Sequence, residues 1–264
     1  MKLSYKLYPF QNSNPNQKSI GTIIILHGLF GSSKNWVTVA KLLSEFGTVY
    51  ALDQRNHGDS PHSETHSIPI MASDLETFLH DFNIQNPILL GHSMGGLVAM
   101  YFDLTHPGVL KKLIVQDIAP RSYPFAYDKE IQSMSFPLDG FTSRSEIDLE
   151  MAKYVPDTFI RQFLQMSLER KEVGLYRWKL NVEGLNQTRR VFEDVFTAEN
   201  PSETKTLFLL GGSSEYIRNS DLDVMDQFFK NNQKVKFEGG GHYIHFTHQK
   251  EFMETLVNWL QRET

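Results

Sequence analysis

Apolar runs of strand length alternate with segments of helical spacing along the first half of the chain. The strand-like runs lie at 22–28, 48–53, 87–93 and 111–117. The segments that carry apolar side chains every three or four positions lie between them, at 34–46, 70–83 and 94–106. Alternation at this spacing predicts βαβ units, because parallel strands need a crossover connection. The expected fold class is α/β, with a mostly parallel sheet and helices on both faces.

The rhythm breaks between Pro120 and about Pro201. This stretch is mostly helix-like, at 143–155 and 157–171, with a segment that reads as extended at 174–185. The alternation then resumes, at 204–212, 221–232, 234–242 and 249–263. We therefore predict an α/β core made of residues 1–120 and 201–264, with residues 121–200 inserted as a helical lid. Open α/β sheets bind ligands at the carboxyl ends of their strands, so the lid should cover a site there.

Composition narrows the partners and the compartment. The formal charge is −5 at pH 7 and the Lys and Arg residues are scattered, which argues against nucleic acid or an anionic membrane as the main partner. The chain has no cysteine, which excludes disulfides and thiolate catalysis and fits a reducing compartment. The longest apolar runs are strand-sized and the first residues lack a signal-peptide core. We expect no membrane-spanning helix and a cytoplasmic protein.

The strongest chemical signal is GHSMG, residues 91–95, which matches G-x-S-x-G directly after a predicted strand and at the start of a predicted helix. In that context the serine sits on a sharp turn that lifts its hydroxyl above the sheet. Bulky residues two positions to either side would clash where strand and helix converge, which explains Gly91 and Gly95. Ser93 is therefore the predicted nucleophile.

The turn LHGLFGS, residues 26–32, also follows a predicted strand. Turns of this kind supply one backbone N–H to an oxyanion hole, and the residue after the nucleophile supplies the other. The expected donors are Leu29 and Met94. His27 is interpreted as a buried structural histidine, and Phe30 as part of the substrate pocket.

His242 is the predicted general base. It follows the last strand-like run, in the loop EGGGHYIH, and it lies downstream of every plausible acid, which satisfies the chain order serine, acid, histidine. The three glycines of that loop allow the bend that brings an imidazole to the serine. The rival is His245, for which the alternatives are a pocket wall or the first turn of the next helix.

Two carboxylates compete to be the acid that orients His242. Asp117 directly follows the strand after the nucleophile helix, and Glu215 follows a later strand in LLGGSSEYI. Neighbouring strand ends converge over the edge of a sheet, so both positions are geometrically open. Asp221 and Asp223 are expected instead to begin and solvate the next helix.

Other chemistries find little support. HGLFGSS lacks the lysine of a phosphate-binding loop, no G-x-G-x-x-G opens a strand–helix unit, and HExxH is absent. A loop cluster of histidines, formed by His57, His62 and His66, is interpreted as polar surface rather than as a metal site. No metal is expected.

Taken together, HGLFGS, DQRNHGDSP, GHSMGG, DIAP and GGGHYIH resemble the α/β-hydrolase superfamily, and most closely its YbfF-type short-chain esterase branch of abhydrolase-domain proteins. The resemblance implies an α/β-hydrolase fold, a Ser–Asp–His triad, no cofactor, and hydrolysis of carboxylic esters or thioesters. Members of the branch carry DIAP or DISP with that aspartate as the triad acid, which favours Asp117 over Glu215. It also implies that Asp53 and Arg55 brace loops beside the site.

The expected function is hydrolysis of a small-molecule acyl ester or thioester of short to medium acyl length. The residues expected to shape the pocket adjoin the site in sequence: Phe30, His92, Tyr123, Phe125 and Tyr243. Two alternatives stay open. One is an acyltransferase that uses the same acyl-enzyme, and the other is a non-catalytic ligand-binding protein on the same scaffold.

Overall fold

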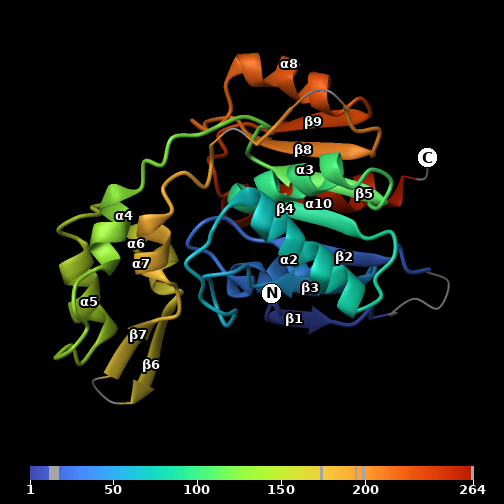
Figure 1. Ribbon diagram of the computed structural model, residues 1–264. Coiled ribbons are helices and arrows are strands. Elements are labelled where there is room, and N and C mark those ends of the chain that lie inside the picture. Colours follow the sequence, from blue (N-terminus) through green and yellow to red (C-terminus); the bar gives the residue numbers. More distant parts are fainter. Residues whose placement is uncertain (12–17, 173–174, 194, 198–199, 263–264) are drawn as a thin grey trace.

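A seven-stranded sheet forms the centre of the protein (Figure 1). The computed structural model describes residues 1–11, 18–172, 175–193, 195–197 and 200–262. Among them, the neighbouring strands in spatial order are β1 (Tyr5–Tyr8), β3 (Thr48–Leu52), β2 (Thr22–Leu26), β4 (Ile88–His92), β5 (Lys112–Gln116), β8 (Thr206–Gly211) and β9 (Asn232–Phe237). Every pairing is parallel except that of β1 with β3. The predicted mostly parallel sheet is confirmed.

Helices cover both faces of this sheet (Figure 1). One face carries the 3-10 helix η1 (Ser33–Trp36), α1 (Val37–Leu43), the short α9 (Ile244–Thr247) and α10 (Gln249–Gln261). The other carries α2 (Ile68–Asp81), α3 (Met94–Thr105) and α8 (Asn219–Phe228). Within β2, Ile23 and Ile25 pack into the first core while Ile24 and Leu26 pack into the second, because successive strand side chains point to opposite faces. Two buried cores result, and they explain the unbroken apolar runs of the central strands.

A separate group of elements lies between β5 and β8 in the chain, to one side of the sheet (Figure 1). We call residues 121–200 the insertion. It contains α4 (Asp128–Met134), α5 (Arg144–Met151), α6 (Thr158–Gln165), β6 (Leu168–Glu172), β7 (Leu175–Trp178) and α7 (Val182–Gln187). Its division from the core at the predicted boundaries stays a prediction. Among the described helices, none has both the length and the apolar character needed to cross a membrane.

Several local predictions are wrong. The helix expected to run to residue 171 ends at Gln165, and the residues after it form β6, which pairs antiparallel with β7. A single-segment pattern does not contain the cross-strand partner of β6; across the two strands Arg177 pairs with Glu169 at 2.6 Å. Gly174 and Glu263, at the ends of two predicted elements, lie outside the described residues.

Two further differences concern the N-terminal part of the core. The edge strand β1 was not predicted, because its side chains are only partly buried and its apolar pattern is weak. The helix predicted at 34–46 is split and shorter. Ser32 caps η1: its hydroxyl oxygen accepts the Lys34 amide at 3.4 Å, and its own amide donates to Asn35 Oδ1 at 2.6 Å. The α-helix begins only at Val37.

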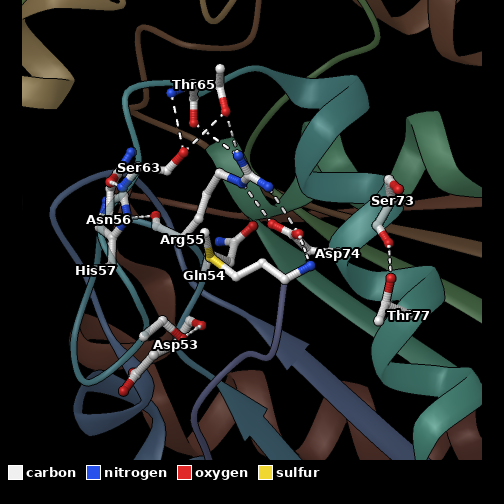
Figure 2. A network of polar contacts seen from close by, with 12 residues as sticks. Asp53, Gln54, Arg55, Asn56, His57, Ser63, Thr65, Ser73, Asp74 and Thr77 are labelled. Atoms are coloured by element: carbon white, nitrogen blue, oxygen red, sulfur yellow. Dashed lines mark hydrogen bonds and ion pairs between the residues drawn. The ribbon is translucent and has the colours of Figure 1, made fainter.

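The loop after β3, residues 53–61, is built on buried polar contacts (Figure 2). Arg55 makes a bidentate ion pair with Asp74 of α2: Nε donates to Oδ2 at 2.6 Å and Nη2 donates to Oδ1 at 2.9 Å. It also donates to the Thr65 carbonyl at 2.9 Å. Asp53 accepts the amides of Ser33 at 2.6 Å and Asp59 at 2.9 Å. The prediction that Asp53 and Arg55 brace loops is confirmed.

Replacing Arg55 by methionine should destabilise the protein by about 3–5 kcal/mol, because the buried Asp74 carboxylate loses its main counter-charge. The side chains of this pair are only 7% and 3% exposed. The matched control is Lys250→Met, which breaks a 3.9 Å pair with Glu254 on a side chain 90% exposed. That change should cost at most about 0.5 kcal/mol. Urea unfolding followed by circular dichroism measures both, and equal losses would contradict the prediction.

Candidate active site

Ser93 occupies a strained turn between β4 and α3. Its backbone lies at φ 51 and ψ −120, a region that residues with a side chain rarely adopt. A Cβ on Gly91 would lie 2.3 Å from the Gly95 carbonyl oxygen, and a Cβ on Gly95 would lie 2.4 Å from that of Leu26. Only glycine therefore fits at either position, which is the physical reason for the spacing of GHSMG.

His242 and Asp117 meet above the carboxyl ends of the strands. His242 Nδ1–H donates to Asp117 Oδ2 at 2.7 Å. Asp117 directly follows β5, at φ 54, and its side chain is fully buried. Oδ1 accepts the Gly211 amide at 2.8 Å and Oδ2 accepts the Ser214 hydroxyl at 2.5 Å. These donors offset the cost of burying the carboxylate.

Glu215, the other candidate acid, is exposed on the loop after β8. The structure brings Asp117 to the imidazole of His242 and leaves Glu215 at the surface. The neighbours of Glu215 contact the site, Ser214 at Asp117 and Tyr216 at His242, while the Glu215 side chain between them is exposed.

The imidazole of His242 is held on both its ring and its backbone. Tyr216 stacks on the ring with centroids 3.8 Å apart and planes inclined by 18°. The His242 carbonyl accepts from His92 Nε2 at 3.0 Å and from Gln116 Nε2 at 3.2 Å. Burial lowers the pKa of His92 well below its ordinary value, so it stays a neutral donor. With Nδ1 engaged by Asp117, the other ring nitrogen of His242, Nε2, is the one turned away from the carboxylate.

Ser93 and His242 line one cavity of about 230 Å³. Four further residues expected near the site line it: Leu29, Phe30, His92 and Tyr243. Tyr123 and Phe125 are not among the lining residues. Tyr123 instead accepts the Ala119 amide at 2.9 Å, and the Phe125 ring packs against Phe192. These two residues support the walls from behind.

Most of the lining that the sequence did not identify comes from the insertion. The missed residues are Tyr127, Glu130, Ile160, Phe163, Leu164 and Tyr216. Ile160, Phe163 and Leu164 share one face of α6, and that spacing was a usable signal for an apolar face. A helical face does not reveal which cavity it covers, so sequence spacing alone could not assign them to the site.

The predicted oxyanion donors flank Ser93. The turn that carries Leu29 packs on the nucleophile, since a Cβ on Gly28 would lie 3.2 Å from Ser93 Cβ. Phe30, at φ 63, donates its amide to His57 Nε2 at 3.2 Å, which fixes the end of the turn. Met94 begins α3. Within the described part of the chain, no hydrogen bond uses the amide of Leu29 or Met94.

The interpretation of the histidine loop as polar surface is wrong for two of its three members. His57 and His66 are buried, and only His62 is exposed. His57 Nδ1–H donates to the Arg55 carbonyl at 2.8 Å while its Nε2 receives the Phe30 amide. The loop packs against the turn at residues 26–32 through the Phe30 amide, and this is a tertiary contact that local polarity does not predict.

The remaining residues that the sequence singled out agree with their predictions to different degrees. His27 is buried as predicted, with Nδ1–H donating to the Gly28 carbonyl at 2.8 Å and Nε2 accepting the Gln54 amide at 3.0 Å. His245 lies in α9, stacked on Trp36 at 4.3 Å, and outside the cavity lining. Asp223 is exposed as expected. Asp221 lies at the start of α8 as expected and accepts the Arg218 amide at 2.8 Å, but it is buried rather than solvated, and it pairs with Arg121 at 3.0 Å.

The fold agrees with what similarity to known proteins shows. The chain matches the family model for the alpha/beta hydrolase fold over residues 21–249. It therefore belongs to the α/β hydrolase fold family, as the resemblance of its motifs predicted.

Individual relatives are named as lipases, esterases and transferases. The sn-1-specific diacylglycerol lipase ABHD11 of Danio rerio is 34% identical over 251 residues, covering 90% of this chain and 78% of the relative. A solved structure described as a marine microorganism esterase is 34% identical with a TM-score of 0.90, covering 97% of this chain and 98% of that one. Ethanol acetyltransferase 1 of Hanseniaspora uvarum is 25% identical over 273 residues, covering 90% and 79%. Family and relatives together support a hydrolase.

The buried histidines make the stability of the protein dependent on pH. Burial lowers the pKa of His27 from its ordinary 6.5 to about 4, so the folded state keeps it neutral where the unfolded state takes up a proton. The free energy of unfolding should therefore decrease as the pH is lowered. His27 alone should account for a loss of about 2 kcal/mol between roughly pH 7 and roughly pH 5.

Chemical denaturation across this pH range measures the effect in the wild type and in two variants. His27→Gln should reduce the pH dependence of the free energy of unfolding. His80→Gln, at a side chain 88% exposed, should retain it. The same pH dependence in both variants would show that His27 does not contribute.

Proposed function

We propose that this protein is a serine hydrolase that cleaves carboxylic esters or thioesters of short to medium acyl length through an acyl-enzyme. Ser93 is the nucleophile, His242 the general base and Asp117 the acid that orients it. The observation that carries the proposal is the 2.7 Å bond from His242 to a buried Asp117 at the cavity that Ser93 lines. A nucleophile, a base and an orienting acid are the parts that acyl transfer requires.

The reaction follows from this arrangement. His242 Nε2 takes the Ser93 hydroxyl proton as Oγ attacks the carbonyl carbon of the substrate. The tetrahedral intermediate collapses when the bond to the leaving alcohol or thiol breaks and His242 returns the proton to it. Water then repeats the sequence on the acyl-Ser93 ester, which releases the acid and restores the enzyme. Throughout, Asp117 holds the Nδ1–H tautomer and stabilises the imidazolium.

The backbone supplies the stabilisation of developing negative charge. The amides of Leu29 and Met94, which lack partners among the described residues, are the proposed oxyanion donors. Met94 also begins α3, a twelve-residue helix whose positive dipole end favours an anion there. The strained turn at Ser93 keeps the nucleophile beside these donors, so little reorganisation is needed during the reaction.

The walls favour a small apolar acyl group. Ile160, Phe163 and Leu164 line the cavity from the insertion, which we propose acts as the lid over the site. A volume of about 230 Å³ is below the roughly 300–1,000 Å³ typical of sites for drug-sized ligands. The size of the cavity supports short rather than long acyl chains, and the substrate class is a small-molecule ester.

Paired substitutions of the two candidate acids test the assignment of the triad. Asp117→Asn should lower kcat on a short-chain chromogenic ester by roughly 10⁴-fold, because the imidazole loses both its tautomer and its counter-charge. Glu215→Gln, at an exposed carboxylate, should leave kcat unchanged. Ser93→Ala should abolish acyl-enzyme formation, which mass spectrometry detects.

Three outcomes would overturn this proposal. Turnover that survives Ser93→Ala would remove the mechanism. A large loss in Glu215→Gln without one in Asp117→Asn would exchange the two acids. Failure of the wild-type protein to turn over any ester would favour the ligand-binding alternative.

Acyl transfer to an alcohol is the second candidate, favoured by the similarity to ethanol acetyltransferase 1 of Hanseniaspora uvarum. Both reactions share the acyl-enzyme and differ in what attacks it. The His242 side chain is 12% exposed, which gives water a route to the base. We expect free acid to be the main product when the enzyme is given an ester and excess ethanol, as measured by gas chromatography. Predominant formation of the ethyl ester would instead establish the transferase.

A further inference from the structure

Glu130 places a carboxylate in the wall of the cavity that holds Ser93 and His242. It lies in the first turn of α4, in the insertion, and its side chain is half-buried. Of the described residues that line the cavity, Glu130 is the one with a carboxylate, and none is a lysine or an arginine. The mechanism proposed above does not use it.

The Glu130 carboxylate lacks a protein partner among the described residues. Arg189, the cation paired with α4, bonds to Asp128 at 2.6 Å instead. Asp117 gives the contrast within the same site, because three donors satisfy its carboxylate. An unpaired carboxylate in a partly buried wall keeps its negative charge available to whatever enters the cavity.

The negative charge of Glu130 affects the tyrosine hydroxyl groups around the site. The Tyr127 and Tyr216 hydroxyls bond to each other at 2.9 Å, and Tyr216 stacks on His242. Burial raises the pKa of Tyr127, Tyr216 and Tyr243, and the charge of Glu130 adds to the rise in each. The charge of Glu130 therefore acts on three tyrosine hydroxyls around the cavity, and these hydroxyls remain neutral.

We propose that Glu130 determines specificity by charge: the site accepts neutral esters and disfavours those with a carboxylate or phosphate near the scissile bond. An anion that entered would approach a like charge with no lysine or arginine in the described lining to compensate it. A neutral substrate avoids that cost, and a substrate hydroxyl can donate to the carboxylate. The inference rests on the proposed function and narrows its substrate class.

Two ethyl esters of equal acyl carbon number, whose hydrolysis is followed by pH-stat titration, test this. They are ethyl butyrate, which is neutral, and ethyl hemisuccinate, which is anionic. Glu130→Gln removes the charge and keeps the size of the side chain. We expect it to raise the ratio of kcat/KM for hemisuccinate over butyrate about tenfold. The control is Glu215→Gln, an exposed carboxylate outside the cavity lining, which should leave the ratio at its wild-type value.

Ionic strength gives a readout that a purely structural role would not move. Added NaCl, from about 0.02 M to about 0.5 M, should raise the wild-type ratio, because salt screens the repulsion. In Glu130→Gln the ratio should depend much less on salt.

The outcomes separate the two proposals. Turnover of butyrate that survives Ser93→Ala would overturn the proposed function. If turnover depends on Ser93 and the ratio is unchanged by Glu130→Gln, specificity by charge is overturned while the function stands. Equal losses on both esters in Glu130→Gln would also overturn it, because they would assign Glu130 a structural role.

Discussion

The buried carboxylate of Asp117 is the constraint on which the rest of the site depends. It follows β5, accepts the Gly211 amide at the end of β8, and binds His242 in the loop after β9. Three separate segments thus converge on one charge. Burying a carboxylate without hydrogen-bond donors costs free energy. The loops that supply the donors to Asp117 are therefore held in one arrangement. The same contacts that make the burial tolerable also orient the imidazole, so local stability and the proposed chemistry share one interaction.

A second network connects the insertion to the turn at residues 26–32 through the loop at residues 53–61. Asn181, at the start of α7, donates its amide to the Asn56 carbonyl at 2.9 Å and its Nδ2 to Asn56 Oδ1 at 3.0 Å. One residue further on, His57 receives the amide of Phe30. Apart from the exposed Asp59, the polar residues of DQRNHGDSP are therefore buried, and they connect neighbouring segments (Figure 2). Asn56 and His57, which are neighbours in the chain, thus contact the insertion and the turn at residues 26–32 respectively.

Sequence patterns predicted those parts of the protein whose physics is local. The alternation of strand and helix identified the parallel sheet, since burial on both faces requires unbroken apolar runs in the central strands. Gly91 and Gly95 identified the turn that carries Ser93, because the backbone approaches so closely at both positions that no side chain fits. The wrong predictions concern residues whose secondary structure or burial depends on a partner distant in the chain. β6 forms because β7 pairs with it, and His57 is buried where it accepts the Phe30 amide of the turn at residues 26–32.

By itself, the sequence determined the fold class, the turn that carries Ser93 and a short set of candidate partners for it, because each rests on spacing within one segment. It left Asp117 and Glu215 geometrically equivalent, with only the resemblance of DIAP favouring one. Tertiary structure decided which carboxylate meets His242, since the answer depends on strand order and on where each loop turns. It also decided the lining of the cavity, Glu130 and Tyr216 included, because those side chains come from elements far apart in the chain.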